Sequence, residues 1–409
     1  MTEATPSRPQ SFVCLASYFK GTEFLRECKR QGRRVVLVTK QKTLGEDWPR
    51  ECLDDLVALP DDAGPELYLQ AADHLARHQK IDRIVALEEF DVINAALIRE
   101  HLCLPGMTST TARLFRDKLS MRVAASRAAI AVPDFVHLLN YEELHDYMSR
   151  VPPPWMLKPR SDVSAMGIRK LESAEQVWRA IDALDAREKA RERSPYYLLE
   201  SYVAGDVYHV DSLVNDARVV FAGANAYGRP PMDVAHGGGV FISKTLRHGS
   251  EDQKRLIRLN RKLIKSLGLS HGAAHAEFIK SAADGEFYFL EIAARVGGAY
   301  IAETLEAASG INLWREWARL EMAQGVERYR APKPRREYGG IVLSLARQEY
   351  PDTSAYTDPE IVYRVRKRHH VGLVVSSPKP ARIEELLGQY ARRFNTDFTA
   401  VAPPLERAE

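Results

Sequence analysis

The sequence predicts a mixed α/β protein whose central part is of the α+β kind. Three observations support this prediction. Strand and helix signals alternate between residues 12 and 107, a meander and a β-hairpin follow within 108–330, and a proline-rich linker at 331–334 opens a short final segment. We therefore expect an N-terminal domain at 1–107, a core at 108–330 and a C-terminal α+β subdomain at 331–409.

The N-terminal domain is expected to be a small parallel α/β unit, because short apolar runs alternate with amphipathic stretches. The expected strands lie at 12–16, 34–39 and 83–87, and the expected helices at 22–31 and 66–78. Gly21 stands alone after the first strand, without the G-x-G-x-x-G pattern that marks a dinucleotide site. The turn formers at 104–106 mark the end of this domain.

The core is expected to mix helices with sequential strands. Its helices are expected at 109–129, 174–184, 250–267 and 301–321, and its strands at 154–158, 196–203, 208–214 and 218–222. Residues 224–240 are rich in turn formers and are expected to form a long loop, a kind of segment that often carries function.

The final segment is expected to contain strands near 340–345, 361–365 and 372–376, a helix at 382–394 and a closing strand. Its basic run RVRKRHH, residues 364–370, could contact an anion or a partner. A solvated strand edge is the favoured interpretation, because charge runs usually face water.

Bulk composition narrows the classes of function. The chain has 409 residues, of which 45% are hydrophobic and 28% charged, an ordinary soluble composition. Its net charge of +3 is too small to indicate nucleic acid binding, and no apolar run approaches membrane-spanning length. The four cysteines lack metal-binding spacing and the polar N-terminus is unlike a signal peptide, so we expect free thiols in a cytoplasmic protein.

A predicted β-hairpin in the second half of the chain carries two acidic residues. Its strands, 273–280 and 286–293, flank an Asp-Gly turn signal. Their even positions are nearly all apolar and are expected to be buried, whereas their odd positions include Glu277 and Glu291. A loop with an odd number of residues, centred on Asp284, would pair the two glutamates directly.

Two carboxylates this close repel each other unless a cation neutralises them. Mg²⁺ prefers carboxylate oxygens and often uses one or two of them beside phosphate oxygens. Downstream, Arg295 and Gly297-Gly298 supply a fixed cation and backbone N–H groups, which are the ingredients of an anion site. The alternative is an ordinary hairpin with two solvated glutamates.

Two lysines upstream of the hairpin are candidates for binding an anion. Lys158 ends an apolar strand, so its ammonium group either reaches water or meets an anion. The loop after it contains Ser161, Ser164 and Gly167, which are small enough to approach a phosphate. Lys118 lies in an amphipathic stretch and would by itself be taken as a surface residue.

Five landmarks follow one another along the chain: Lys118, Lys158 with its loop, residues 200–203, residues 275–277 and residues 291–295. In this order they resemble the ATP-grasp superfamily, in its carboxylate–amine ligase branch, and residues 81–107 resemble the end of the domain that precedes the core there. The resemblance implies an ATP-grasp fold with an N-terminal Rossmann-like domain at 1–107. It also implies a lid at about 130–203 within the core and a small C-terminal α+β domain.

The resemblance implies how ATP and its metal ion would be held. Lys118 and Lys158 would bind the phosphates, and the loop that contains Ser164 would close over them as a lid. Glu277 and Glu291 would bind Mg²⁺ that bridges the phosphates, and Mn²⁺ could replace it.

The resemblance also assigns the nucleoside contacts. Glu200 would accept a hydrogen bond from the adenine amino group, and the backbone of Tyr202 and Val203 would contact the ring edge. Ile279 would pack against the adenine. His209 would contact the ribose, although a satisfied structural histidine is an equally open interpretation.

Arg295 would have the catalytic role of stabilising charge on the transferring phosphoryl group. The sequence departs from the family at Ala293, where an asparagine usually supplies a further metal ligand. The lid loop is also poor in glycine and contains only Gly167.

The implied function is an ATP-dependent ligase that joins a carboxylate to an amine or thiol through an acyl-phosphate, releasing ADP and phosphate. Its partners would be small-molecule carboxylate and amine substrates, without nucleic acid or membrane, and a homodimer would suit the family. The acceptor pocket would be formed by the N-terminal domain, residues 224–240 and the region after Gly298. Two alternatives stay open: a biotin-carboxylase-type enzyme that activates bicarbonate, and a non-catalytic ATP-binding regulatory module.

Overall fold

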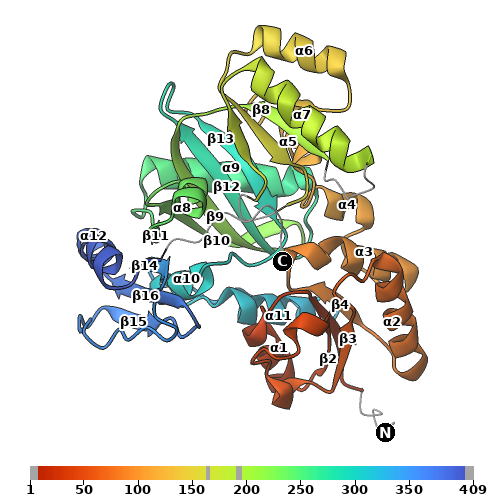
Figure 1. Cartoon of the computed structure of the whole chain (residues 1–409). Helices are drawn as coiled ribbons and strands as arrows, with labels where there is room; N and C mark the ends of the chain where they lie inside the picture. Colours follow the sequence, from red (N-terminus) through yellow and green to blue (C-terminus); the bar gives the residue numbers. More distant parts are fainter. Residues whose placement is uncertain (1–7, 163–165, 190–195, 401–409) are drawn as a thin grey trace, which may run out of the picture.

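The computed structural model describes residues 8–162, 166–189 and 196–400. Within these residues the strands form three sheets, each with its own helices (Figure 1). The N-terminal domain has a parallel sheet of four strands, the core an antiparallel sheet of eight, and the lid region an antiparallel sheet of four. The predicted mixed α/β class is therefore confirmed. No helix in these ranges is long and apolar enough to cross a membrane.

The N-terminal sheet has the strand order β3-β2-β1-β4, and all its pairs are parallel, as predicted. Its strands are β1 (Ser11–Ala16), β2 (Arg34–Lys40), β3 (Asp55–Leu59) and β4 (Arg83–Ala86), and its helices are α1 (Thr22–Arg30), α2 (Pro65–His78) and α3 (Val92–His101). The strand order reverses between β1 and β4. In sheets of this kind, ligands bind outside the carboxyl ends of the strands at that point, where residues 17–20 and 88–91 meet.

The lid sheet has the strand order β5-β8-β6-β7 and is covered by two helices, at the top of Figure 1. Its strands are β5 (Phe135–His137), β6 (Trp155–Pro159), β7 (Arg169–Leu171) and β8 (Tyr197–Ser201), and its helices are α6 (Tyr141–Arg150) and α7 (Ala174–Lys189). The sheet and its two helices have an apolar cluster of their own, which includes Trp155, Leu157, Val177 and Leu199. This sheet, which falls within the region expected to be the lid, is thus packed as a separate unit.

The large sheet has the order β13-β12-β9-β10-β11-β14-β16-β15. Its strands are β9 (Gly205–Asn215), β10 (Arg218–Tyr227), β11 (Phe241–Thr245), β12 (Gly272–Ser281), β13 (Phe287–Ala293), β14 (Tyr338–Leu345), β15 (Ile361–Arg364) and β16 (His370–Ser377). The associated helices are α4 (Ser109–Arg113), α5 (Lys118–Arg127), α8 (Pro231–Gly237), α9 (Glu251–Leu267), α10 (Ile301–Ser309), α11 (Leu313–Ala323) and α12 (Pro380–Asp397).

The C-terminal segment does not form a sheet of its own. Strand β14 pairs with β11 of the core, so β14, β16 and β15 extend the large sheet, although α12 gives this end its own apolar cluster. Up to residue 400, where the description ends, the expected closing strand is a single bridge between Ala346 and Thr399.

Three expected elements of the core differ from the structure. The helix expected at 109–129 is two helices, because Asp117 has extended backbone angles and its carboxylate caps α5 by accepting from the N–H groups of Leu119 and Ser120. The helix expected at 301–321 is interrupted at Gly310, whose φ is 75°. The loop expected at 224–240 is shorter, because β10 continues to Tyr227 and α8 follows.

Candidate active site

The hairpin of β12 and β13 places Glu277 directly opposite Glu291, as predicted. The expected reason for this pairing was wrong. At the turn Lys280 pairs with Phe287, which leaves a loop with an even number of residues instead of an odd one. A β-bulge then inserts Leu290 as an extra residue in β13, and this insertion brings the two glutamates into register.

The bulge also changes which side chains of β13 face the core. Phe289 was expected on the glutamate face but is fully buried beside Phe278, with ring centroids 5.9 Å apart. Tyr288 and Leu290 instead pack against the apolar cluster that contains Ile279. A residue inserted into one strand shifts the alternation of faces by one position, so the parity used for the prediction holds only on one side of the bulge.

Glu291 is paired with the first lysine of the site. Its Oε2 lies 3.0 Å from Nζ of Lys118, which also donates to the carbonyl of Asp162 at 2.7 Å. Burial alone would raise the pKa of Glu291, but the ammonium of Lys118 and, further away, that of Lys158 lower it to about 2. Lys118 is the first residue of α5, so the cap at Asp117 fixes where its ammonium lies.

Glu277 contacts a tyrosine hydroxyl and a histidine ring, whereas Glu291 is paired with a lysine. The hydroxyl of Tyr227 donates to its Oε1 at 2.6 Å, and Nε2 of His275 lies 3.4 Å from the same atom. Sequence reasoning did not find Tyr227, because it falls in the stretch expected as a loop.

The second lysine, Lys158, lies on strand β6. Its ammonium is paired with Glu200, whose carboxylate also binds Arg122 at 2.9 Å. Glu200 is 1% exposed, so its side chain is not available to the adenine amino group in this structure, which corrects the expectation. Burial would raise the pKa of Glu200, but Arg122 and Lys158 lower it. The carboxylate acts here as the anchor of two cations.

One of the backbone groups expected to contact the adenine already forms a hydrogen bond within the protein. The N–H of Tyr202 donates to the carbonyl of Pro154 at 3.1 Å, which leaves the carbonyl of Tyr202 and the amide of Val203 as candidates. Val203 and Ile279 pack in one apolar cluster, and the contact of Ile279 with the adenine stays a prediction. Ser164 lies outside the described residues.

His209 does not lie on an open surface. It is fully buried, with Nδ1 2.6 Å from Oδ2 of Asp211 and Nε2 2.7 Å from Oγ of Ser243. A ribose cannot reach a ring whose two nitrogens are both engaged in the interior. The expected ribose contact is therefore wrong for this structure, and the structural interpretation of His209 is the better one.

Arg295 connects the core with the N-terminal domain. It lies 2.9 Å from Glu89, which also binds Arg116 at 2.7 Å, and Glu88 is paired with Lys20 at 2.6 Å. Burial would lower the pKa of Arg295, but Glu89 and Glu88 raise it. Both glutamates follow β4 at the carboxyl edge of the parallel sheet, which is the signal that could have identified them.

The arrangement fits a nucleotide phosphate with a divalent cation. Nε of Arg295 is buried and has no hydrogen-bond partner among the described residues, so a donor is available for an anion. Glu277 and Glu291 supply adjacent carboxylates for Mg²⁺, and Lys118 and Lys158 supply cations nearby. The structure therefore brings the two glutamates of the hairpin close to both lysines and to the guanidinium of Arg295.

The family model of the ATP-grasp domain matches residues 151–303. This segment of the chain belongs to the ATP-grasp domain family. A curated relative, an L-arginine-specific L-amino acid ligase of Bacillus subtilis, is 23% identical over 255 residues, which are 61% of this chain and 59% of that protein. The match thus spans less than two thirds of the relative, and it agrees with the expected carboxylate–amine ligase branch.

Several solved structures share the fold over nearly the whole chain. An L-amino acid ligase from Bacillus licheniformis has a TM-score of 0.72 at 16% identity, with 97% of this chain and 99% of that chain covered. An N5-carboxyaminoimidazole synthetase from Staphylococcus aureus has a TM-score of 0.70 at 13% identity, covering 94% and 97%. The biotin carboxylase domain of the Hydrogenobacter thermophilus 2-oxoglutarate carboxylase has a TM-score of 0.69 at 17% identity, covering 96% and 91%. The predicted ATP-grasp fold is confirmed.

Proposed function

We propose that this ATP-grasp protein is an ATP-dependent ligase that joins a small carboxylate to an amine and releases ADP and phosphate. The pairing of Glu277 with Glu291 beside Lys118 is the observation that carries the proposal. L-amino acids are the proposed substrates, because a curated relative and a solved structure of the same fold are both named as L-amino acid ligases.

The residues of this chain divide the work of the reaction. Lys118 and Lys158 would bind the phosphates of ATP, and Glu277 and Glu291 would hold Mg²⁺, or Mn²⁺ in its place. When bound, the metal ion neutralises charge on the phosphate oxygens. Arg295 would bind the substrate carboxylate and the phosphoryl group transferred to it, where negative charge develops. The amine then displaces phosphate from the acyl-phosphate, so the new amide bond needs no nucleophilic side chain.

The substrate carboxylate would lie between Arg295 and the carboxyl edge of the N-terminal sheet. Arg295 already contacts Glu89 there, so the two domains meet at the reacting end of the site. The lid helices and the loop that contains Ser164 would close over the phosphates. Ala293 leaves the metal with fewer protein ligands than the family usually provides, so we propose that the two glutamates are sufficient.

ADP release, measured with pools of amino acids and Mg·ATP, tests this function. We expect release that requires two substrates, one supplying the carboxylate and one the amine, and that Glu291→Ala abolishes it. Release that needs bicarbonate and no amine would favour a biotin-carboxylase-type reaction. Binding of ATP without turnover in every pool would favour a regulatory module and would overturn the ligase proposal.

We also propose that the protein is cytoplasmic and forms a homodimer. All four cysteines are free thiols in the structure, which suits a reducing compartment. Size-exclusion chromatography with light scattering would measure the oligomeric state.

A further inference from the structure

A buried polar network adjoins Glu277, and it includes His209, whose ring is engaged in the interior. It contains Ser243, His209, Asp211 and His275, and it reaches Glu277 together with Tyr227. These residues come from four neighbouring strands, β9 to β12. Buried polar groups are costly unless they are fully hydrogen-bonded, so a network of this size calls for a reason.

We propose that Tyr227 and the Asp211–His275 pair are positioning residues that present Glu277 to the metal ion and fix the loop that follows Arg295. This inference rests on the proposed function, because it requires Glu277 to bind a metal ion. Outer partners of this kind orient metal ligands in proteins, and their loss typically weakens metal binding.

The donors to Glu277 converge on one of its two oxygens. The Tyr227 hydroxyl and Nε2 of His275 lie 2.6 Å and 3.4 Å from Oε1. The described residues provide no hydrogen-bond donor to Oε2. Glu277 is therefore held by one oxygen and offers the other, which is the arrangement of a ligand that binds a metal ion through a single oxygen.

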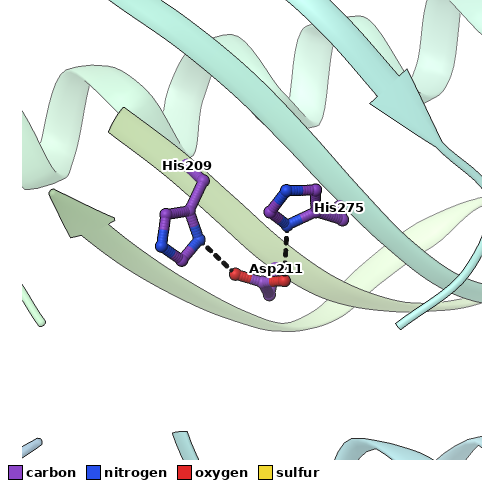
Figure 2. A group of neighbouring side chains, drawn as sticks. All are labelled: His209, Asp211 and His275. Carbon is purple, nitrogen blue, oxygen red and sulfur yellow. Dashed lines mark hydrogen bonds and ion pairs between the residues drawn. The ribbon is translucent and has the colours of Figure 1, made fainter. Parts of the chain in front are cut away.

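Asp211 sets the orientation of His275. Figure 2 shows its carboxylate between the two imidazole rings, with Oδ1 2.9 Å from Nδ1 of His275 and Oδ2 2.6 Å from Nδ1 of His209. Because Nδ1 of His275 faces Asp211, its Nε2 is directed to Glu277. Ser243 holds the far nitrogen of His209 at 2.7 Å and thereby anchors the network on β11.

The same pair supports the loop after Arg295. A Cβ atom at Gly297 would lie 2.6 Å from Oδ1 of Asp211 and 3.0 Å from Nδ1 of His275, so only glycine allows the loop to approach this closely. One hydrogen-bonded pair thus contacts both the metal ligand and the loop that carries the catalytic arginine.

The three residues could in principle hold a metal ion themselves, because their donor atoms lie within 4.8 Å of one another. Two features favour the hydrogen-bonded interpretation. The oxygen–nitrogen distances of 2.6 Å and 2.9 Å are those of hydrogen bonds. The loop at Gly297 also runs against this pair, because even a Cβ atom there would lie only 2.6 Å from Oδ1 of Asp211 and 3.0 Å from Nδ1 of His275.

Titration of the full chain with Mn²⁺ in the presence of ADP, followed by the EPR signal of free Mn²⁺, tests the proposal without measuring turnover. We expect Tyr227→Phe to weaken Mn²⁺ binding by about 10–100-fold. Asp211→Asn should weaken it as well, because His275 loses the partner that orients it. The matched control is Tyr390→Phe, which removes a partly buried hydrogen bond from α12 to the carboxylate of Asp358 and should leave Mn²⁺ binding unchanged.

Each outcome separates this inference from the proposed function. Unchanged Mn²⁺ affinity in folded Tyr227→Phe, checked by its melting temperature against Tyr390→Phe, would overturn the positioning role while leaving the ATP site intact. Mn²⁺ binding that survives Glu277→Gln but is lost in His209→Ala would overturn it in favour of an ion held by the histidines. A native chain that binds no Mn²⁺ with ADP would contradict the proposed function itself.

Discussion

At the scale of single residues, a deeply buried ion pair joins α5 of the core to β8 of the lid sheet. Arg122 and Glu200 are 0% and 1% exposed, and Lys158 is paired with the same carboxylate. Removing one partner of such a group leaves the others charged and unpaired in the interior, which costs more than the intact pair contributes. Glu200 is therefore a structural anchor for a lysine that the proposed function needs.

Glu200→Gln should lower the free energy of unfolding by about 3–5 kcal/mol, because Arg122 and Lys158 lose their counter-charge. The pKa of Glu200 is lowered in the folded protein, so its stabilisation is fully present above the unfolded pKa of about 4.3 and is lost as the pH falls from there through the lower pKa of the folded state. The difference between native and variant should thus be largest near neutral pH and shrink in acid.

Urea unfolding of both proteins between pH 7 and pH 3 measures this difference. Glu172→Gln is the matched control, since its pair with Lys170 lies on the exposed surface of the same lid and should contribute at most about 1 kcal/mol. A loss in Glu200→Gln no larger than that of the control would show that the buried pair is not the anchor.

At the scale of secondary-structure elements, short local features set the position of the site. The bulge at Leu290 aligns Glu277 with Glu291, and the cap at Asp117 begins α5 at Lys118. Asp117 also pairs with Arg160, the residue that precedes the lid loop, and the carbonyl of Arg160 accepts from the N–H of Lys118. The N-terminus of α5 and the lid loop are thus held together.

The sequence predicted periodic elements well and interruptions poorly. The parallel N-terminal strands and the hairpin follow from apolar runs and a turn signal, and the pairing of Glu277 with Glu291 is confirmed. The bulge at Leu290 has no signal of its own in the residue pattern, because it depends on packing of Phe289 against Phe278. The roles of Glu200 and His209 were also missed, since burial of a polar residue depends on partners distant in sequence.

Asp117→Ala should destabilise the protein by about 1–2 kcal/mol through loss of the cap, in addition to the loss of its pair with Arg160, and should also weaken ADP binding. The second effect is expected because Lys118 is the first residue of the helix and its position depends on the cap. Isothermal titration with Mg·ADP and thermal unfolding measure the two effects separately.

Ser250→Ala provides the comparison for the cap. Ser250 caps α9 by accepting from the N–H of Gln253, so its loss should cost a similar amount of stability without changing nucleotide affinity. Equal ADP affinity in the two variants would contradict a role for the α5 cap in placing Lys118.

At the scale of the whole molecule, the N-terminal domain and the core share their apolar interior. One cluster contains Phe12 and Phe24 of the N-terminal domain together with Ala273 of β12 and Trp317 of α11, whereas the lid has a cluster of its own. Helices α1 and α11 lie side by side in Figure 1. A shared interior favours one cooperative transition for these two parts and a separate, less stable transition for the lid.

Trp317→Ala should therefore lower the stability of the N-terminal domain and the core together, by about 3–5 kcal/mol. Trp317 is 4% exposed and packs edge-on against Phe24, with ring centroids 5.3 Å apart, so its removal leaves a cavity between α1 and α11. Differential scanning calorimetry should show one large transition that moves to lower temperature as a unit.

Trp178→Ala, which removes a half-buried ring packed against Tyr141 in the lid, should shift only the lid transition. If Trp317→Ala instead splits off a separate transition of the N-terminal domain and leaves the core where it was, the two parts do not share one interior.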